Sequence, residues 1–284
     1  MALMTAFRPK GEAIYRHRLV TRLCHWTLVL AMALLLMSGL QIFNAHPRLY
    51  WGQYGANADP ALLELGATQS DAGEIKGFTQ IGPWTFPTTG LLGASRAADG
   101  SMDSRGFPRW ITLPREQDLA AGRRWHFLFA WLLAGAGTVY LTFGALSRHF
   151  QRDLFLTGEE IEPRHLLHDV WDHLRFRQPT GEAAKRYNTL QKAAYLAVIF
   201  ALVPLMVATG LTMSPGMDSA FPWLLDLFGG RQSARTIHFV TANLIVLFVI
   251  VHLFEVLIAG AWNEVRSMIT GWYLVRQPKA GGGS

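Results

Sequence analysis

Residues 237–252 read IHFVTANLIVLFVIVH, an apolar run with a histidine near each end. His238 and His252 are fourteen residues apart, which is about 3.9 turns of an α-helix, so both side chains point to nearly the same face. The rise between them is roughly 21 Å, which would set the two imidazoles at different depths of a membrane. A histidine in a membrane span is costly unless it is buried and used, so this stretch predicts two functional sites along one helix.

Four stretches of the chain are long and apolar enough to cross a membrane, which takes about 20 residues. Half of the residues are hydrophobic and only 16% are charged, below the roughly 25% of a soluble domain. The net charge is +6, but Lys and Arg cluster beside the apolar runs, where membrane proteins carry them, and this pattern argues against a nucleic-acid partner. We predict an all-α integral membrane protein, a bundle of four transmembrane helices at 23–43, 125–146, 193–213 and 237–260.

We predict that residues 1–280 form a single membrane domain, which includes the segments outside the four spans. A long connection at 44–122 joins the first two spans, and its many aromatics, as in IGPWTFP at 81–87, favour a small ordered cap over a mobile linker. Three amphipathic stretches, at 166–174, 221–228 and after Trp262, are expected at membrane surfaces or in packing contacts. Residues 281–284, GGGS, have the composition of an added linker.

Basic residues predict that both termini face the cytoplasm, because cytoplasmic loops of membrane proteins carry the excess of Lys and Arg. The connection between the third and fourth spans has only Arg231 and Arg235. The other flanks are richer, and their basic residues are Arg8, Lys10, Arg16, Arg18, Arg22, Arg148, Arg152, Arg164, Arg175, Arg177, Lys185, Arg186, Arg266, Arg276 and Lys279. The connection at 44–122 is then on the outer face.

This topology sorts the four histidines of the spans into two level pairs. His25 and His252 lie toward the cytoplasmic ends of their spans, and His126 and His238 toward the outer ends. Each pair can ligate one haem iron from both sides, which leaves no axial position open for oxygen and suits electron transfer. With a single cysteine, Cys24, the C-x-x-C-H attachment of c-type haem is excluded, so both haems would be held without covalent bonds.

Three arginines stand where they can support haem binding. Arg22, Arg123 and Arg235 each precede a predicted ligand by three residues, one helical turn away on roughly the same face. A guanidinium at that place can pair with a haem propionate. The alternative is that these arginines mark the membrane boundary.

Two glycines share the faces of predicted ligands. Gly39 follows His25 by fourteen residues and Gly137 follows His126 by eleven. A missing side chain there would admit a flat porphyrin, although close packing of membrane helices also uses glycine.

Beyond these residues, the sequence resembles the dihaem cytochrome b561-like bacterial membrane family, which includes cytochrome b subunits of nickel–iron hydrogenases and gamma subunits of formate dehydrogenases. The resemblance covers about 14–275. It is carried by RLCHW at 22–26, by His126, by the His238–His252 spacing and by YNTLQK at 187–192. It implies the same histidine pairs, two non-covalent haem b groups and a multi-pass location in the bacterial inner membrane.

The resemblance also implies a site for ubiquinone or menaquinone near the haem of His25 and His252. Gamma subunits form part of that site with an Asn-x-x-Gln-Lys stretch, which here is Asn188, Gln191 and Lys192. Glu255 lies one turn beyond His252, and we add it as a group that can exchange protons with the quinone. Helix capping and surface solvation are the alternative roles for these four residues.

Three functions remain open on the sequence alone. The leading interpretation is an electron-transfer subunit of an oxidoreductase, between the quinone pool and a periplasmic redox protein or catalytic subunit. The connection at 44–122 is longer than in compact members of the family, and the resemblance implies a partner of molybdopterin type, because the chain looks most similar to relatives that serve such enzymes. The alternative is a stand-alone superoxide:quinone oxidoreductase, with a basic funnel formed by Arg123, Arg124, Arg231 and Arg235 that steers an anion. The third is a non-redox transporter or scaffold with structural histidines.

Overall fold

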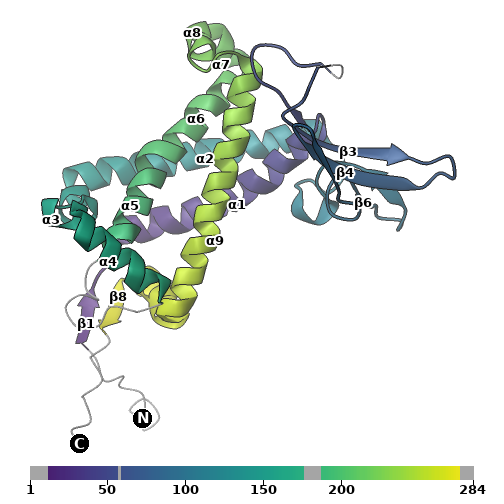
Figure 1. The fold of residues 1–284 in the computed structure, drawn as a ribbon. Helices are drawn as coiled ribbons and strands as arrows, with labels where there is room; N and C mark the ends of the chain where they lie inside the picture. Colours follow the sequence, from purple (N-terminus) through teal and green to yellow (C-terminus); the bar gives the residue numbers. More distant parts are fainter. Residues whose placement is uncertain (1–11, 57–58, 176–186, 276–284) are drawn as a thin grey trace, which may run out of the picture. The chain divides into compact units, whose positions relative to one another are not determined.

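The structure is a computed structural model that describes residues 12–56, 59–175 and 187–275 (Figure 1). Four helical segments are long and apolar enough to cross a membrane: α1 (Leu19–Asn44), α2 (Leu119–Leu146), Thr189–Thr212 and α9 (Arg231–Thr270). They confirm the four predicted spans, and each begins a few residues before its predicted start. Residues 281–284 and some basic residues used for the topology, at 8, 10, 177, 185, 186, 276 and 279, lie outside the described residues.

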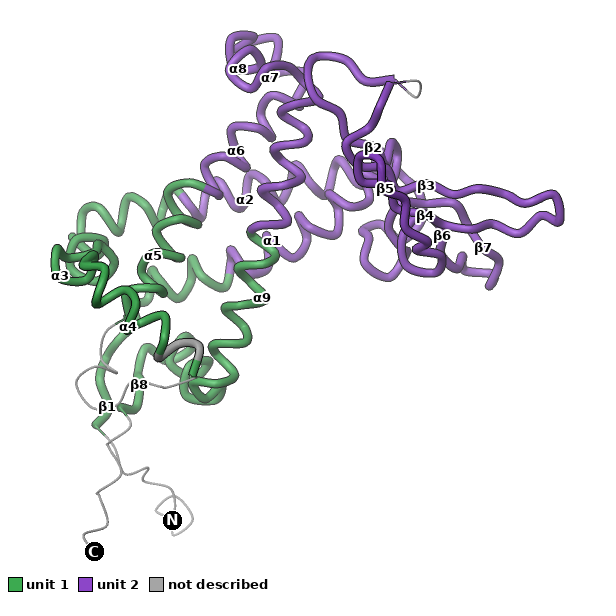
Figure 2. Tube along the Cα trace, viewed as in Figure 1, with its two compact units in different colours: residues 1–26, 138–201, 245–284 green, residues 27–137, 202–244 purple. Residues whose placement is uncertain are grey.

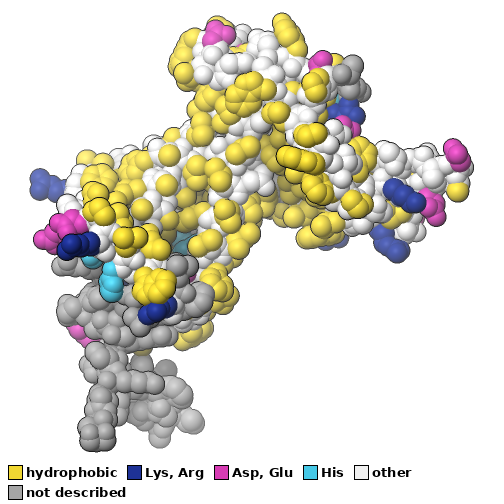
Figure 3. Space-filling view, in the orientation of Figure 1, with side chains coloured by type: hydrophobic (Ala, Val, Ile, Leu, Met, Phe, Trp, Pro, Cys, Tyr) yellow, Lys and Arg dark blue, Asp and Glu magenta, His cyan; other side chains and the backbone are white. Residues whose placement is uncertain are grey.

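Apolar side chains of the spans point outward rather than into a water-excluded core. None of the eighteen most apolar residues of α9 is buried, and Leu247 and Leu257 are 56% and 67% exposed. Hydrophobic side chains cover the visible faces of α6 and α9 in Figure 3. Helices satisfy their own backbone hydrogen bonds, so this surface is suited to lipid.

The third span is not one regular helix. It runs as α5 (Thr189–Ala197), a π-helical turn (Val198–Leu202) and α6 (Val203–Thr212). Pro204 lies just after the π turn. A proline has no N–H to donate and its ring clashes with the carbonyl four residues earlier, and the wider turn before it relieves that conflict.

The candidate fourth span runs to Thr270, and its helix is interrupted at Gly260, the residue at which the predicted span ends. Gly260 has φ 105 and ψ 82 inside α9, a left-handed backbone that favours glycine. The helix after it holds the amphipathic stretch that begins beyond Trp262. The other two amphipathic stretches are also helical, as α4 (Pro163–Leu174) and as α8 (Pro222–Leu227). The short helix α7 (Pro215–Ala220) precedes α8, and α3 (Gly158–Ile161) and a π turn (Phe150–Leu154) precede α4.

The chain divides into two compact units (Figure 2). Unit 1 is Met1–Trp26, Thr138–Ala201 and Ile245–Ser284, and unit 2 is Thr27–Gly137 and Leu202–Leu244. Each of the four spans contributes to both units. His25 and His252 fall in unit 1, and His126 and His238 fall in unit 2, so the predicted partners share a unit.

The segment between α1 and α2 corrects the all-α prediction, because it is built of β-strands. β2 (Arg48–Leu49), β3 (Leu63–Gln69), β4 (Ile75–Ile81) and β5 (Trp84–Pro87) form an antiparallel sheet in that order, and β6 (Ala94–Arg96) pairs with β7 (Met102–Ser104). A 3-10 turn (Arg109–Ile111) follows. Gly73 and Gly82, with φ 82 and 54, occupy the β3–β4 and β4–β5 turns, where a positive φ favours glycine.

A small apolar core fastens this sheet to the end of α1. Phe43, Leu49 and Leu65 are each at most 5% exposed and pack together. Phe43 also stacks on Phe239 at 4.8 Å between ring centroids and meets Phe107 at 5.7 Å. Unit 2 therefore contains one core shared by helix and sheet.

Arg105 adds a buried polar anchor in the same unit. It is 4% exposed, and it donates to the carbonyls of Phe107 and Arg115, both at 2.9 Å. It also donates to Gln41 Oε1 at 3.2 Å and Thr112 Oγ1 at 3.1 Å. The strand segment is thus joined to α1 and to the chain entering α2.

The start of α9 is capped by the segment that follows α1. The Gly52 carbonyl accepts hydrogen bonds from the backbone N–H groups of Gln232 and Ser233, at 3.0 and 3.1 Å. Ser233 Oγ accepts from Gly52 N at 2.7 Å, and Thr236 Oγ1 donates to the Tyr50 carbonyl at 2.6 Å. Helix termini need such partners for their free N–H groups, and here they fix the turn that precedes His238.

In unit 1, the two ends of the described chain pair with each other. β1 (Glu12–Tyr15) and β8 (Trp272–Val275) form a two-stranded antiparallel sheet, with Tyr15 opposite Trp272. The Arg16 guanidinium lies over the rings of Tyr187 and Tyr273, at 4.8 and 4.7 Å from their centroids. These cation–π contacts tie the start of α1 to the start of α5 and to β8.

Candidate functional site

The imidazoles of His126 and His238 face each other in unit 2. Their ring centroids are 6.3 Å apart and their planes are inclined by 63°. Two imidazoles that each place a nitrogen about 2 Å from one metal ion would have centroids separated by about 6 Å. Both side chains are half-buried, so the predicted partners meet at a spacing that fits one iron.

A hydroxyl group contacts the Nδ1 atom of each ring. Ser38 Oγ on α1 lies 3.1 Å from His126 Nδ1, and Thr209 Oγ1 on α6 lies 3.0 Å from His238 Nδ1. Ser38 and Thr209 are both fully buried. Every ring of this pair therefore has one nitrogen engaged by the protein.

The hydrogen bonds of these hydroxyls decide which nitrogen carries the proton. Ser38 Oγ donates to the Leu34 carbonyl at 2.6 Å, and Thr209 Oγ1 donates to the Leu205 carbonyl at 2.7 Å. A hydroxyl has one hydrogen to donate, so toward the imidazole it acts as an acceptor. Nδ1 is then the protonated nitrogen of each ring, and Nε2 keeps the lone pair that a metal binds.

The residues after these hydroxyls are glycines that lie against the same rings. A Cβ at Gly39 would lie 3.3 Å from His126 Cε1, and one at Gly210 would lie 3.4 Å from His238 Cε1. Gly39 therefore lies against the ring of His126. A Cβ at Gly137 would meet no atom of the chain within 4 Å.

Sequence reasoning missed three members of this arrangement: Ser38, Thr209 and Gly210. A signal was present, because Ser38-Gly39 and Thr209-Gly210 are both hydroxyl–glycine dipeptides inside predicted spans. Only the fold brings each dipeptide against a histidine of another helix.

His25 and His252 both belong to unit 1. The His252 ring stacks on Phe248 at 5.9 Å between centroids and meets Tyr195 at 6.3 Å, and His25 meets Trp26 at 5.1 Å. His25 Nδ1 is buried with no hydrogen-bond partner among the described groups. Such an orphaned polar atom costs free energy, and a metal ion bound at Nδ1 would remove that cost.

The three arginines predicted to contact propionates are engaged by the protein. Arg22 donates to the carbonyl of Ile269, and the Arg123 guanidinium lies 5.7 Å from the centroid of the Phe127 ring. Arg235 donates through its two terminal nitrogens to the carbonyls of His46 and Arg48. Their pairing with propionates stays a prediction.

The predicted quinone residues include a helix cap. Asn188 Oδ1 accepts from the backbone N–H of Gln191 at 2.7 Å, and Gln191 Oε1 accepts from that of Asn188 at 3.4 Å, a reciprocal capping box at the start of α5. Lys192 is 6% exposed and its Nζ lies 2.7 Å from Glu160 Oε1. These contacts give all three residues a structural role, which a quinone role would share.

Aromatic contacts join this cap to a predicted ligand. Tyr187 meets Tyr195 at 5.5 Å between centroids, and Tyr195 meets both Phe248 and His252. Burial raises the pKa of the Tyr187 phenol above its ordinary value, so Tyr187 is neutral at physiological pH. Tyr187, next to Asn188, is thus linked to the ring of His252 through Tyr195.

The other predicted residues lie as follows. Glu255 is half-buried on α9. Of the four arginines of the predicted funnel, Arg124 is exposed, while Arg231 donates to the Met213 carbonyl at 3.1 Å and lies 3.8 Å from Asp218. The Arg123 guanidinium lies over a ring and that of Arg235 is bound to two carbonyls. The engaged guanidinium groups therefore each have a different partner, and among the described contacts none brings the four together.

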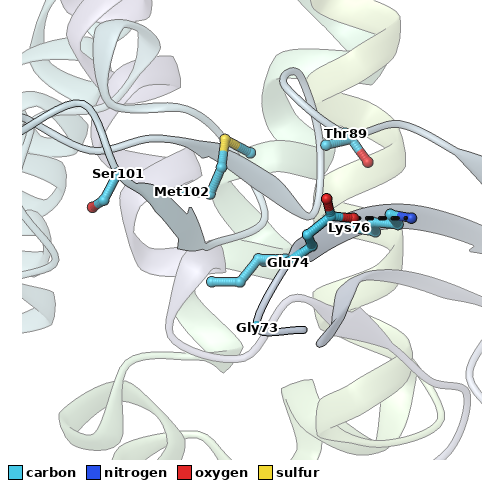
Figure 4. Close-up of a pocket in the computed structure, with 7 residues that line it drawn as sticks. Gly73, Glu74, Lys76, Thr89, Ser101 and Met102 are labelled. Atoms are coloured by element: carbon cyan, nitrogen blue, oxygen red, sulfur yellow. Dashed lines mark ion pairs between the residues drawn. The ribbon is translucent and has the colours of Figure 1, made fainter. Parts of the chain in front are cut away.

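Apart from these histidines, the described residues contain no cluster of metal-binding side chains, and a pocket that they form lies on the sheet. No group of three or more His, Cys, Asp or Glu side chains among the described residues can hold a metal ion, whereas a haem iron asks the protein for only two. A shallow pocket on the sheet, drawn in Figure 4, contains none of the predicted site residues, and its Glu74–Lys76 ion pair is solvent-exposed. Its lining is Gly73, Glu74, Ile75, Lys76, Thr89, Ser101 and Met102.

Four candidate spans with paired, half-buried histidines define the class of membrane cytochromes. A family model described as prokaryotic cytochrome b561 matches residues 16–271, and the chain belongs to this family. The protein is therefore a membrane-integral b-type cytochrome of electron transfer, and membership implies that it binds haem b. The paired histidines described above fit such a group.

Relatives name two kinds of complex. The chain is 27% identical over 250 residues to a putative protein-methionine-sulfoxide reductase subunit YedZ1 from Azospira oryzae, across 88% of this chain and 93% of that protein. It is 26% identical over 160 residues to a probable Ni/Fe-hydrogenase B-type cytochrome subunit from Cupriavidus necator, across 52% of this chain and 65% of that protein. A protein of the same name from Azotobacter vinelandii is 25% identical over 169 residues, covering 54% and 69%. No solved structure matches the chain.

Proposed function

We propose that the protein is a dihaem membrane cytochrome that carries electrons between the quinone pool and a periplasmic redox partner. One observation carries this proposal: two pairs of histidines from the spans, each pair within its own unit, with one pair facing at 6.3 Å. His126 and His238 would hold one haem b, and His25 and His252 the other. Haem b supplies reversible one-electron transfer when its iron has two axial ligands.

The protein's own residues fix the ligands and exclude other chemistry. Two imidazoles per iron leave no axial position for oxygen. The hydroxyls of Ser38 and Thr209 hold one pair of rings with Nδ1 protonated. Reduction of a quinone to a quinol takes two electrons and two protons. The haem of His25 and His252 would exchange the electrons with a quinone bound near Asn188, Gln191 and Lys192. Glu255 would exchange the protons.

The relatives support a subunit rather than an isolated enzyme. They are named as subunits of a methionine-sulfoxide reductase and of hydrogenases, so this chain would likewise serve a separate catalytic protein, which we infer to be periplasmic and of molybdopterin type. The β-structure between α1 and α2 is anchored by Arg105 to α1 and to the chain entering α2. It would be the docking side of the cytochrome, on the periplasmic face of the bacterial inner membrane.

Haem content and ligand variants test the proposal. Purified full-length protein should hold two haems per chain, measured as pyridine haemochrome against protein mass. His252→Ala should lose one haem and its quinone reactivity and keep the other, while His126→Ala should lose the opposite one. Loss of the same haem from both variants would contradict the pairing, and a preparation without a Soret band would contradict the function.

Variants that preserve the capping box test the quinone site separately. Asn188→Asp and Gln191→Glu keep the side-chain oxygens that cap α5, because Asp at the N-cap and Glu three residues later make the same reciprocal bonds. They remove the amide N–H groups that a quinone oxygen would accept from. We expect slower quinone reduction with unchanged haem spectra and thermal stability; unchanged quinone kinetics in both variants would leave these residues with capping alone.

A stand-alone superoxide:quinone oxidoreductase remains the second candidate from the sequence. Its basic funnel gains no support from the four arginines, which do not share one contact. Quinone reduction by the isolated chain that depends on superoxide and is insensitive to any catalytic partner would nevertheless favour it. Recovery of a catalytic subunit with the chain from native membranes would favour the electron-transfer subunit.

A further inference from the structure

The two hydroxyl contacts of unit 2 have the same construction on two different helices. In each, a buried hydroxyl donates along its own helix and accepts from the Nδ1 of a facing histidine, and the glycine that follows lies against the same ring. Four helical segments take part: α1 with Ser38, α2 with His126, α6 with Thr209 and α9 with His238. The tautomer of both rings is therefore set by the protein before any metal binds.

We propose that Ser38 and Thr209 are positioning residues that lower the reduction potential of the haem held between His126 and His238. This inference rests on the proposed dihaem function. Neither hydroxyl touches the iron; each acts through the imidazole to which it is bonded.

The direction of the effect follows from the charge on the ring. An Nδ1–H that donates a hydrogen bond shifts negative charge into the imidazole and makes Nε2 a stronger donor. Ferric iron carries one more positive charge than ferrous iron, so the stronger donor stabilises the oxidised haem and lowers its potential. Removal of the hydroxyl acceptor should raise the potential.

Each hydroxyl acts on a different ring of the same pair, Ser38 on His126 and Thr209 on His238. We therefore expect a shift larger in the double variant than in either single one, with both imidazoles still bound.

The effect should also be confined to one haem. His25 Nδ1 is buried without a hydrogen-bond partner among the described groups, so no comparable hydroxyl acts on that ring. A change at Ser38 or Thr209 should leave the potential of the haem of His25 and His252 where it was. The haem of His25 and His252, whose surroundings are unchanged in these variants, is thus an internal reference in every measurement.

Redox titration of the purified full-length protein, followed by the reduced α-bands, tests the inference. Ser38→Ala, Thr209→Val and the double variant should raise the midpoint potential of one haem and leave the other unchanged. The low-spin ferric EPR signal of that haem should shift as well, since it reports the donor strength of the axial ligands. Ser38→Thr and Thr209→Ser retain a hydroxyl and should restore wild-type values.

Thr212→Val is the matched control. Thr212 is 1% exposed, lies on the same helix as Thr209 and donates in the same way to a carbonyl of that helix, Thr209 O at 2.6 Å. It has no contact with a histidine ring among its described hydrogen bonds, so its loss should not move either midpoint. An equal shift in Thr212→Val, or unchanged midpoints in Ser38→Ala and Thr209→Val, would overturn the inference.

Haem loss is informative in the same experiment. Loss of one haem from Ser38→Ala but not from Ser38→Thr would support a role of the hydroxyl in positioning the ring. Loss from both would attribute the effect to side-chain size and overturn the inference. Wild-type protein without two haems would refute the proposed function, whereas two haems with unmoved midpoints would refute only the role of Ser38 and Thr209.

Discussion

At the scale of the residue, the sites depend on atoms that are missing as much as on those present. Gly39 leaves room for the His126 ring, and Gly210 leaves room for that of His238. The histidines could be predicted from the sequence because an imidazole inside a span is rare and costly. The hydroxyls could not, since Ser and Thr are common in membrane helices and become meaningful only when a second helix brings a ring to them.

Gly39→Ala should disturb the site of His126 and His238. The new Cβ would lie 3.3 Å from His126 Cε1, so the ring must move by a few tenths of an ångström, and its Nε2 with it. We expect lower haem occupancy or a shifted α-band, measured by haemochrome and low-temperature spectra. Gly135→Ala on α2 meets nothing within 4 Å and serves as the control; equal effects of both variants would contradict the contact.

His17 predicts how stability depends on pH. It is 8% exposed, and burial, with Arg16 adding repulsion, lowers the pKa of His17 to about 4. In the unfolded chain this pKa is near 6.5. Between pH 6.5 and pH 4, the imidazole of His17 is therefore protonated in the unfolded state and neutral in the folded state. Stability should fall as the pH drops from 6.5 toward 4, by about 2 kcal/mol at pH 5.

Thermal unfolding of the wild type and His17→Gln at pH 7 and pH 5 measures this loss. The wild type should lose more stability on acidification than the variant does. His165→Gln, at an exposed histidine of α4, should behave as the wild type. A His17→Gln protein with undiminished acid sensitivity would mean that another group dominates.

At the scale of the element, the helices were easier to predict than the strands. A membrane span can be recognised in the sequence as about twenty apolar residues. The irregular turn of the third span is also explained by a residue of the sequence, Pro204. The strands of 44–122 are only two to seven residues long, and their burial does not alternate regularly. The period-2 signal of a half-buried strand is therefore absent, and the aromatics indicated order without indicating its kind.

Arg105→Met should loosen the β-structure from the helices. The change leaves the Arg115 carbonyl, Gln41 Oε1 and Thr112 Oγ1 without this donor, whereas the Phe107 carbonyl keeps Asn44 Nδ2 at 3.1 Å. Each unsatisfied buried group costs about 1–3 kcal/mol, so the melting temperature should fall clearly.

Differential scanning fluorimetry in detergent measures that fall. Arg96→Met, at an exposed arginine of β6, removes the same charge without these contacts and should leave the melting temperature almost unchanged. Equal melting temperatures for Arg105→Met and the wild type would show that water replaces the guanidinium at no cost.

At the scale of the whole molecule, the orientation of the chain decides which of the two proposed haems would lie nearer the periplasmic partner. The chain's single cysteine, Cys24, is buried, so Cys24→Ser gives a background without reactive thiols. In that background, Ser101→Cys in the β-segment should react with a membrane-impermeant maleimide on intact cells. Glu159→Cys in α3 should react only after the membrane is opened, and the reverse pattern would invert the assignment of the two haems.

The pairing of β1 with β8 has a consequence for how the protein is made. Among the described strands, β1 has no partner other than β8, which is synthesised only after all four spans. The backbone of β1 must therefore stay unpaired while every span enters the bilayer. A chain truncated before Trp272 would keep that edge open, and an unpaired strand edge is a template for pairing with another chain.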